Sequence, residues 1–88
     1  MSVRRVNQPM PANVRTDHAG HPVHIAWHVP GGATRGGEVE HVMDVWYVDD
    51  AWWTAHPVRR IYHECQLATG ARIIAVRDLV TGSWFAQR

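Results

Sequence analysis

Lysine is absent from this chain of 88 residues, cysteine occurs once and leucine occurs twice. The single cysteine, Cys65, excludes an internal disulfide framework of the kind that holds many small secreted domains together. No apolar run approaches the roughly 18 residues of a membrane-spanning helix. The basic start Met1–Val6 is followed by polar residues and Pro9 rather than by the apolar region of a signal peptide. We therefore expect a cytoplasmic protein with no membrane partner.

The chain also lacks a large net charge. Nine arginines and eight acidic residues leave a formal net charge of +1 with histidine neutral. Proteins that bind nucleic acid irrespective of sequence usually have a stronger basic bias, because contacts with the phosphate backbone dominate their affinity. The charge balance therefore disfavours such a protein and gives no broad field to attract an anionic partner.

Residues suited to strands are abundant instead. The chain has twelve valines and four isoleucines, and β-branched residues pack well on a pleated sheet but lose side-chain freedom in a helix. Its length fits one domain, which buries roughly 60% of the surface that its unfolded chain exposes. We expect a flexible lead-in over residues 1–11, with Pro9 and Pro11, and a single β domain over residues 12–88.

The order of apolar, polar and turn-forming residues predicts up to six strands. They are expected at 12–16, 21–29, 39–48, 57–67, 72–78 and 83–88, with turns at 17–20, 69–70 and 80–82 and a loose loop from Pro30 to Gly37. The 39–48 segment does not alternate cleanly, which predicts a bulge or partial burial of both faces. The fold class is therefore all-β: a five- or six-stranded antiparallel meander that forms a small SH3-like barrel or a strongly twisted sheet.

Strand alternation also predicts which side chains are buried, because successive residues of a strand face opposite sides of the sheet. The apolar side of two strands carries the expected core residues Val23, Ile25, Trp27, Ile61, Cys65 and Leu67. The His24/His28 side and the Arg60/Glu64 side are expected to be wetter.

Seven histidines raise the question of a metal site. On a strand, His24 and His28 share a face but lie about 13 Å apart, whereas His21 faces the other side. His63 and Cys65 share a face as neighbours, but two ligands remain two short of a structural zinc site. We expect neither a metal nor another cofactor, and we expect Cys65 to pack as a small hydrophobic residue.

Catalytic machinery is likewise not recognisable in the sequence. There is no serine in a nucleophile-elbow context, no glycine-rich phosphate loop opening a helix and no pair of carboxylates in an evident cleft. Asp49 and Asp50 are more simply read as the end of a strand. We expect a protein that is not an enzyme and has no catalytic residue.

Tryptophan is enriched, with five residues of this type in the chain. A domain this small needs large buried side chains, so Trp27, Trp46 and Trp84 are expected to contribute to its core. Trp52 and Trp53 are adjacent, so in extended chain they face opposite ways and one of them is expected to be exposed. An exposed tryptophan is a typical anchor of a protein interface.

Short motifs along the chain resemble a family. They comprise Gly20-His-Pro-Val-His-Ile-Ala-Trp27, Val45-Trp46 with Trp52-Trp53, Arg59-Arg-Ile-Tyr62, and Arg77-Asp-Leu-Val-Thr-Gly-Ser-Trp-Phe85 with Gln87-Arg88. In this order they resemble a small actinobacterial domain of unknown function that occurs near genes of a Y-family (ImuB-like) translesion polymerase. The resemblance covers residues 12–88 and implies an accessory role in DNA repair. The chain departs from the family pattern at His63, Glu64 and the Gly31–Gly37 loop, which weakens the implied basic strand.

Two functional hypotheses follow. The first is a non-enzymatic interaction module that docks onto a DNA-repair or replication protein. Its expected interaction residues are Trp52, Trp53, Arg59, Arg60 and Tyr62. The alternative is a module that binds single-stranded nucleic acid, stacking bases on Trp46, Tyr62 or Trp84 with Arg59, Arg60 and Arg72 on phosphates.

Overall fold

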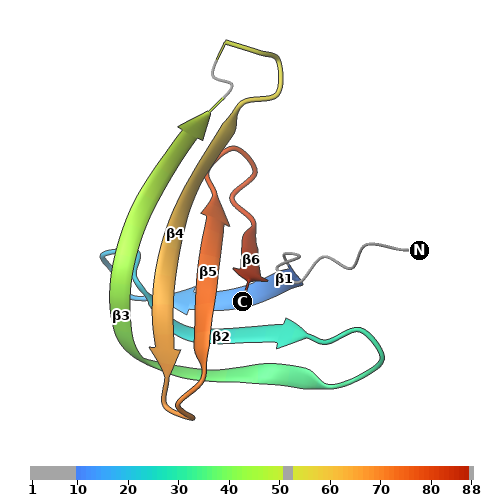
Figure 1. The fold of residues 1–88 in the computed structure, drawn as a ribbon, viewed down its shortest axis with the longest axis vertical. Coiled ribbons are helices and arrows are strands. Elements are labelled where there is room, and N and C mark those ends of the chain that lie inside the picture. Colours follow the sequence, from blue (N-terminus) through green and yellow to red (C-terminus); the bar gives the residue numbers. More distant parts are fainter. Residues whose placement is uncertain (1–9, 51–52, 88) are drawn as a thin grey trace, which may run out of the picture.

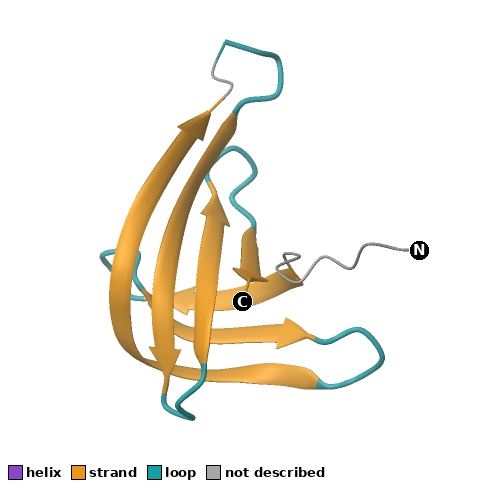
Figure 2. Cartoon of the chain, viewed as in Figure 1, coloured by secondary structure: helices purple, strands orange, loops and turns teal. Residues whose placement is uncertain are grey.

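Six antiparallel strands make up the fold of this computed structural model, which describes residues 10–50 and 53–87 (Figures 1 and 2). The strands are β1 Met10–Thr16, β2 Pro22–His28, β3 Thr34–Asp50, β4 Val58–Leu67, β5 Arg72–Asp78 and β6 Trp84–Gln87. Each strand pairs with the next, and β1 pairs with β6, so the sheet closes into a small barrel. The all-β meander predicted from the sequence is confirmed. Within the described residues, no helix is long and apolar enough to cross a membrane.

Short turns with local hydrogen bonds join the strands. The carboxylate of Asp17 accepts hydrogen bonds from the backbone N–H groups of Ala19 and His21, both at 2.9 Å. The carboxylate of Asp78 does the same for Val80 at 2.8 Å and Thr81 at 3.2 Å. Such aspartate turns hold the chain reversal without help from the core, which explains why the sequence located them correctly.

The long strand β3 belongs to two parts of the barrel. Its first residues, Thr34–Glu38, pair with β2, whereas Val39–Asp50 pair with β4. The pairing with β4 shifts register between Val39 and His41 and again between Val42 and Asp44. These irregularities confirm the predicted bulge and let the strand bend from one partner to the other, as Figure 1 shows.

The predicted loop from Gly31 to Gly37 was wrong in its second half, because β3 already begins at Thr34. Glycine suggests a loop, but Gly36 has a different role here. A Cβ atom at this position would lie 2.7 Å from the Cα atom of Ala26 and would overlap the carbonyl of Ile25. The glycine therefore allows β2 and β3 to approach closely at the start of the bend.

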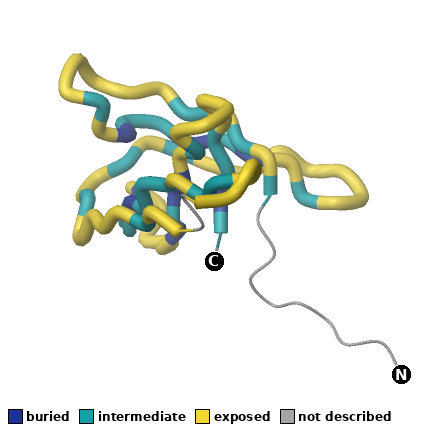
Figure 3. Tube along the Cα trace, turned by 90° about the horizontal axis from the view of Figure 1, so that it is seen from above, coloured by how far each residue is buried: buried dark blue, intermediate teal, exposed yellow. Residues whose placement is uncertain are grey.

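The barrel interior holds most of the predicted core. Ile25, Trp27, Cys65 and Leu67 are buried as expected, and they cluster with Ile73, Ala75 and Ala86. Val23 and Ile61 are half-buried. Figure 3 shows that buried residues lie on the strands and that the loops are exposed. Of the expected wetter positions, His28 is exposed, whereas His24, Arg60 and Glu64 are half-buried.

The β3–β4 hairpin projects beyond the rest of the barrel. The last pair between β4 and β5 joins Arg60 to Asp78, whereas β3 and β4 continue to the pair Asp50 and Val58. Figure 1 places the projecting hairpin and the β5–β6 turn at the same end of the molecule. The projection has fewer neighbouring strands, so its side chains are exposed on more sides.

Candidate interaction surface

Large apolar side chains are exposed along the second half of β3 and in the two turns at the projecting end of the barrel. Among residues 10–50 and 53–87, the exposed large hydrophobic residues are Met43, Val45, Trp46, Tyr47, Trp53, Leu79 and Val80. They come from the second half of β3, from the β3–β4 loop and from the β5–β6 turn. We call this set the hairpin end. Exposed apolar residues scattered singly are ordinary, but their concentration on one half-strand and the two turns at its end indicates a surface that contacts something.

Hydrogen bonds fix the parts of the hairpin end relative to one another. The N–H of Leu79 donates to the carbonyl of Arg59 at 2.8 Å, so the β5–β6 turn is attached to β4. The N–H of Gly82 donates to the carbonyl of Asp78 at 2.8 Å and closes the same turn. Leu79 and Val80 are therefore presented from a turn with an ordered backbone, which reduces the entropy lost on binding a partner.

The outer face of the sheet carries an aromatic row. The register aligns Trp46 with Tyr62, Tyr62 with Val76 and Val76 with Phe85 across four strands. The rings of Trp46 and Tyr62 stack with centroids 5.2 Å apart and planes inclined by 6°. Val76 is only 3% exposed although it faces outward, because its neighbours on both sides are large. Trp46 remains 37% exposed, so the expectation that it lies in the core was wrong.

Charged groups flank this row on both sides. Asp44 pairs with Glu64 on one side of the Trp46–Tyr62 pair, and Val48 pairs with Arg60 on the other. The Nε atom of Arg60 is buried and has no hydrogen-bond partner among the described residues. Two carboxylates therefore lie nearer to one edge of the aromatic pair, and one arginine, partly buried, lies at the other.

A polar cluster occupies the inner face of the projecting hairpin. The Tyr47 hydroxyl donates to Asp49 at 3.1 Å, and the Nε–H of Arg59 donates to the Tyr47 oxygen at 3.4 Å. Arg59 also forms an ion pair with Asp49, with an N–O distance of 3.9 Å. The hydrogen bond to Tyr47, followed by the charges of Tyr47 and Asp49, raises the pKa of Arg59 above its ordinary value. The guanidinium is thus already engaged within the domain.

Trp84 lies on the other side of the sheet from Trp46 and Tyr62. Its ring is tilted against His63 at a centroid distance of 5.5 Å, and the guanidinium carbon of Arg77 lies 5.8 Å from the ring centroid. Trp84 also packs against the buried core. The three residues expected to stack on bases are therefore divided between two faces of the sheet.

The expected interaction residues are brought together only in part. Trp53 is 68% exposed at the hairpin end, whereas Trp52 lies outside the described residues. Arg59 and Arg60 are adjacent in β4 and face opposite sides, so they cannot serve one flat surface together. The sequence reasoning missed Tyr47 and the Leu79-Val80 pair. The sequence did contain a signal for Leu79 and Val80, because two apolar residues within a turn are exposed.

His63 and Cys65 face the barrel interior, as their strand positions predicted. His63 is 4% exposed, and its Nδ1 lies 3.3 Å from the carbonyl oxygen of Ala75. Burial, the main cause, lowers the pKa of His63, and burial raises the pKa of the Cys65 thiol to about 11. A thiol in this state is a poor nucleophile and a poor metal ligand. In the part of the chain that the structure describes, no three His, Cys, Asp or Glu side chains are grouped to hold a metal ion.

Comparison of the chain with models of protein families, with curated proteins and with solved structures gives no match. The functional argument therefore depends on the geometry of the surface. That geometry offers an ordered, apolar end on a closed barrel whose buried thiol is not activated.

Proposed function

We propose that this domain is a non-enzymatic interaction module and that a partner protein docks onto its hairpin end. One observation supports this most directly: the exposed large apolar residues of the described chain all come from the second half of β3, the β3–β4 loop and the β5–β6 turn. Tryptophan, tyrosine and methionine are enriched in protein interfaces, and anchors of this kind carry much of the binding energy.

The partner that suits this surface is apolar and carries polar groups as well. Met43, Val45 and Trp53 offer apolar contacts. Asp49 and Arg59 are partly exposed and paired between Tyr47 and the β3–β4 loop, where they would affect specificity more than affinity. The sequence resemblance suggests a DNA-repair or replication protein of the cytoplasm as the partner.

The test uses a double variant, Trp53→Ala with Val80→Ser, and quantitative affinity purification from the native cell after DNA damage. A protein enriched by the wild type should be lost with the double variant. The captured protein, once purified, should bind the double variant at least about thirtyfold more weakly than it binds the wild type, since an anchor residue typically contributes more than 2 kcal/mol. His18→Ala, at an exposed turn, is the matched control.

Thermal unfolding of each variant separates loss of binding from loss of fold. Both replaced side chains are exposed, so the double variant should unfold within a few degrees of the wild type. If the same proteins are enriched by the wild type and by the folded double variant, the hairpin end is not the docking surface.

The alternative function is binding of single-stranded nucleic acid on the outer face. The Trp46–Tyr62 stack favours it, because an exposed aromatic surface can accept a base. The adjacent carboxylates of Asp44 and Glu64 oppose a phosphate backbone. Titration of tryptophan fluorescence with an oligonucleotide at two salt concentrations tests it. Quenching that weakens steeply with salt would support this function, and a flat titration at low salt would eliminate it.

A further inference from the structure

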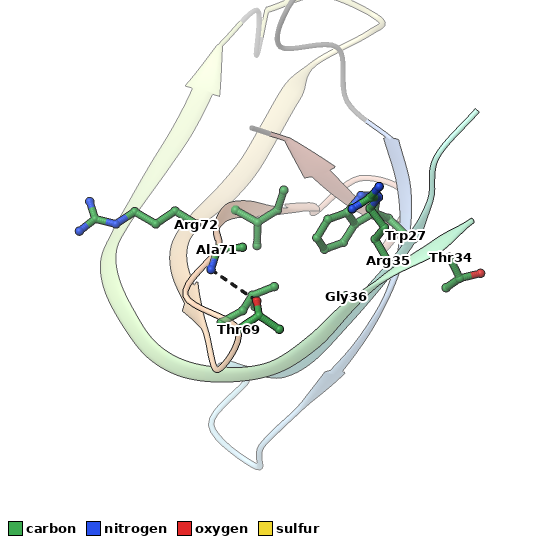
Figure 4. A pocket seen from close by; sticks show the side chains of 9 residues that line it. Trp27, Thr34, Arg35, Gly36, Thr69, Ala71 and Arg72 are labelled. Atoms are coloured by element: carbon green, nitrogen blue, oxygen red, sulfur yellow. Dashed lines mark hydrogen bonds between the residues drawn. The ribbon is translucent and has the colours of Figure 1, made fainter. Parts of the chain in front are cut away.

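A pocket opens at the other end of β4 from the hairpin end. It lies between the close of β2, the start of β3 and the β4–β5 turn, and its volume is about 540 Å³ (Figure 4). Ligand pockets in proteins typically measure about 300–1,000 Å³. The space is therefore large enough for a small organic molecule, and it shares none of its lining with the hairpin end.

Core side chains form the apolar part of this pocket. Trp27, Leu67 and Ile73 all line it, and each is at least nine-tenths buried in the barrel. Gly36 lines it from β3, at the position where the bent strand approaches β2. Because the apolar lining belongs to the core, it is held in place without a ligand.

Two hydrogen-bond donors at the pocket lack an acceptor. Arg35 lies directly across the strand pair from Trp27, so both side chains project from the same face, and Figure 4 shows them beside each other. Among the described residues, Arg35 forms no ion pair, and the buried Nε1 of Trp27 has no hydrogen-bond partner. The exposed guanidinium of Arg35 is therefore available to an acceptor that enters the pocket beside the Trp27 indole.

Arg72 provides an internal comparison. It also lines the pocket, but its side chain points away from it in Figure 4. The register agrees, because Arg72 pairs with Gln66, whereas the inward Ile73 pairs with the buried Cys65. The positive charge that faces the pocket therefore comes from Arg35.

We propose that this pocket binds a small amphipathic carboxylate, with its apolar body against Trp27, Leu67 and Ile73. The carboxylate pairs with the guanidinium of Arg35, next to the Trp27 indole. Arginine suits this purpose because its planar donors match the two oxygens of a carboxylate. This site is independent of the proposed docking surface, so either can fail without the other.

The test uses 2-naphthoate as the probe and its neutral isostere 2-naphthamide as the matched ligand. Binding is followed by NMR through the indole N–H resonance of Trp27 and by calorimetry. Naphthoate should shift that resonance and bind more tightly than naphthamide. Arg35→Gln should weaken naphthoate binding roughly tenfold or more, as expected for the loss of a charge-assisted hydrogen bond. Arg72→Gln, at a side chain that points away from the pocket, should weaken naphthoate binding less than Arg35→Gln does.

Because Arg35 and Arg72 are both exposed, both variants should keep the wild-type unfolding temperature. The proposal is overturned if naphthoate leaves the Trp27 resonance unmoved, if naphthamide binds equally well, or if the two arginine variants weaken binding alike.

Discussion

Replacement of Gly36 by alanine tests the close approach of β2 and β3 directly. Gly36 has a φ of 147°, a conformation that residues with a Cβ atom rarely adopt, and the strain costs about 1–3 kcal/mol. The new Cβ atom would also lie 2.7 Å from the Ala26 Cα atom and would overlap the Ile25 carbonyl. The two strands would have to separate, weakening one or two hydrogen bonds at about 0.5–1.5 kcal/mol each. We expect Gly36→Ala to lower the free energy of unfolding by about 3 kcal/mol.

Gly37→Ala is the matched control for this experiment. Gly37 has no positive φ, and its Cβ atom would lie 3.9 Å from the Thr69 methyl carbon, an ordinary contact. This variant should be neutral or more stable by about 0.4–1 kcal/mol, because alanine restricts the unfolded chain. Urea unfolding followed by tryptophan fluorescence measures both. If the two variants differ from each other by less than about 1 kcal/mol, the close approach does not depend on Gly36.

Three further predictions concern the core. The Cys65 thiol, with its pKa raised to about 11 by burial, should not react with Ellman's reagent at pH 8 until the protein unfolds; rapid reaction of the folded protein would contradict its burial. Burial favours the neutral form of His63 and lowers its pKa. The contribution of His63 to stability is therefore complete above about pH 6.5, the pKa of the unfolded chain, and it is lost as the pH falls from there toward the native pKa. The urea midpoint of unfolding should fall less between pH 7.5 and pH 5 in His63→Asn than in the wild type. Leu67→Ala should reduce stability by about 2–5 kcal/mol, whereas Val80→Ala, at an exposed turn, should change it by less than about 0.5 kcal/mol, both measured by thermal unfolding.

The inner faces of β2 and β4 could be predicted because alternation there is regular. Ile25 and Trp27, like Cys65 and Leu67, are two residues apart in stretches without a register shift, so a single parity describes each stretch. At the start of β2 the pairing with β1 shifts register, and there Pro22 is buried whereas the predicted core residue Val23 is half-buried. The aspartate turns could be located for a similar reason, because their hydrogen bonds are local. Local patterns predicted local structure.

The path of β3 could not be derived in the same way. Two register shifts change which residues face inward, and neither the position of a shift nor the partner of each half is encoded by alternation. Trp46 was expected in the core because of its size, although it lies on the outer face. Gly36 and Gly37 were assigned to a loop because glycine usually marks a turn, and the close approach of Gly36 to Ile25 and Ala26 arises only once β2 and β3 are paired.

The hairpin end and the pocket could be predicted even less. Trp53 was recognised as a candidate anchor, but Tyr47, Leu79 and Val80 join it only through the fold. The pocket likewise depends on Arg35 lying opposite Trp27, in a segment that had been expected to be a loop. Such surfaces arise from the relative position of strands, which no single segment specifies.

The closure of β1 on β6 has a consequence for how the barrel opens. Within the described residues, this seam consists of three paired positions, which join Met10, Pro11 and Ala12 to Ala86, Phe85 and Trp84. It also joins residues far apart in sequence, so its formation carries the largest loop-closure cost of any strand pair in this meander. Local opening should therefore begin at this seam, which hydrogen exchange would detect as early loss of protection at Ala86. Each opening would briefly expose two unpaired edge strands, the feature through which β proteins exchange strands or aggregate.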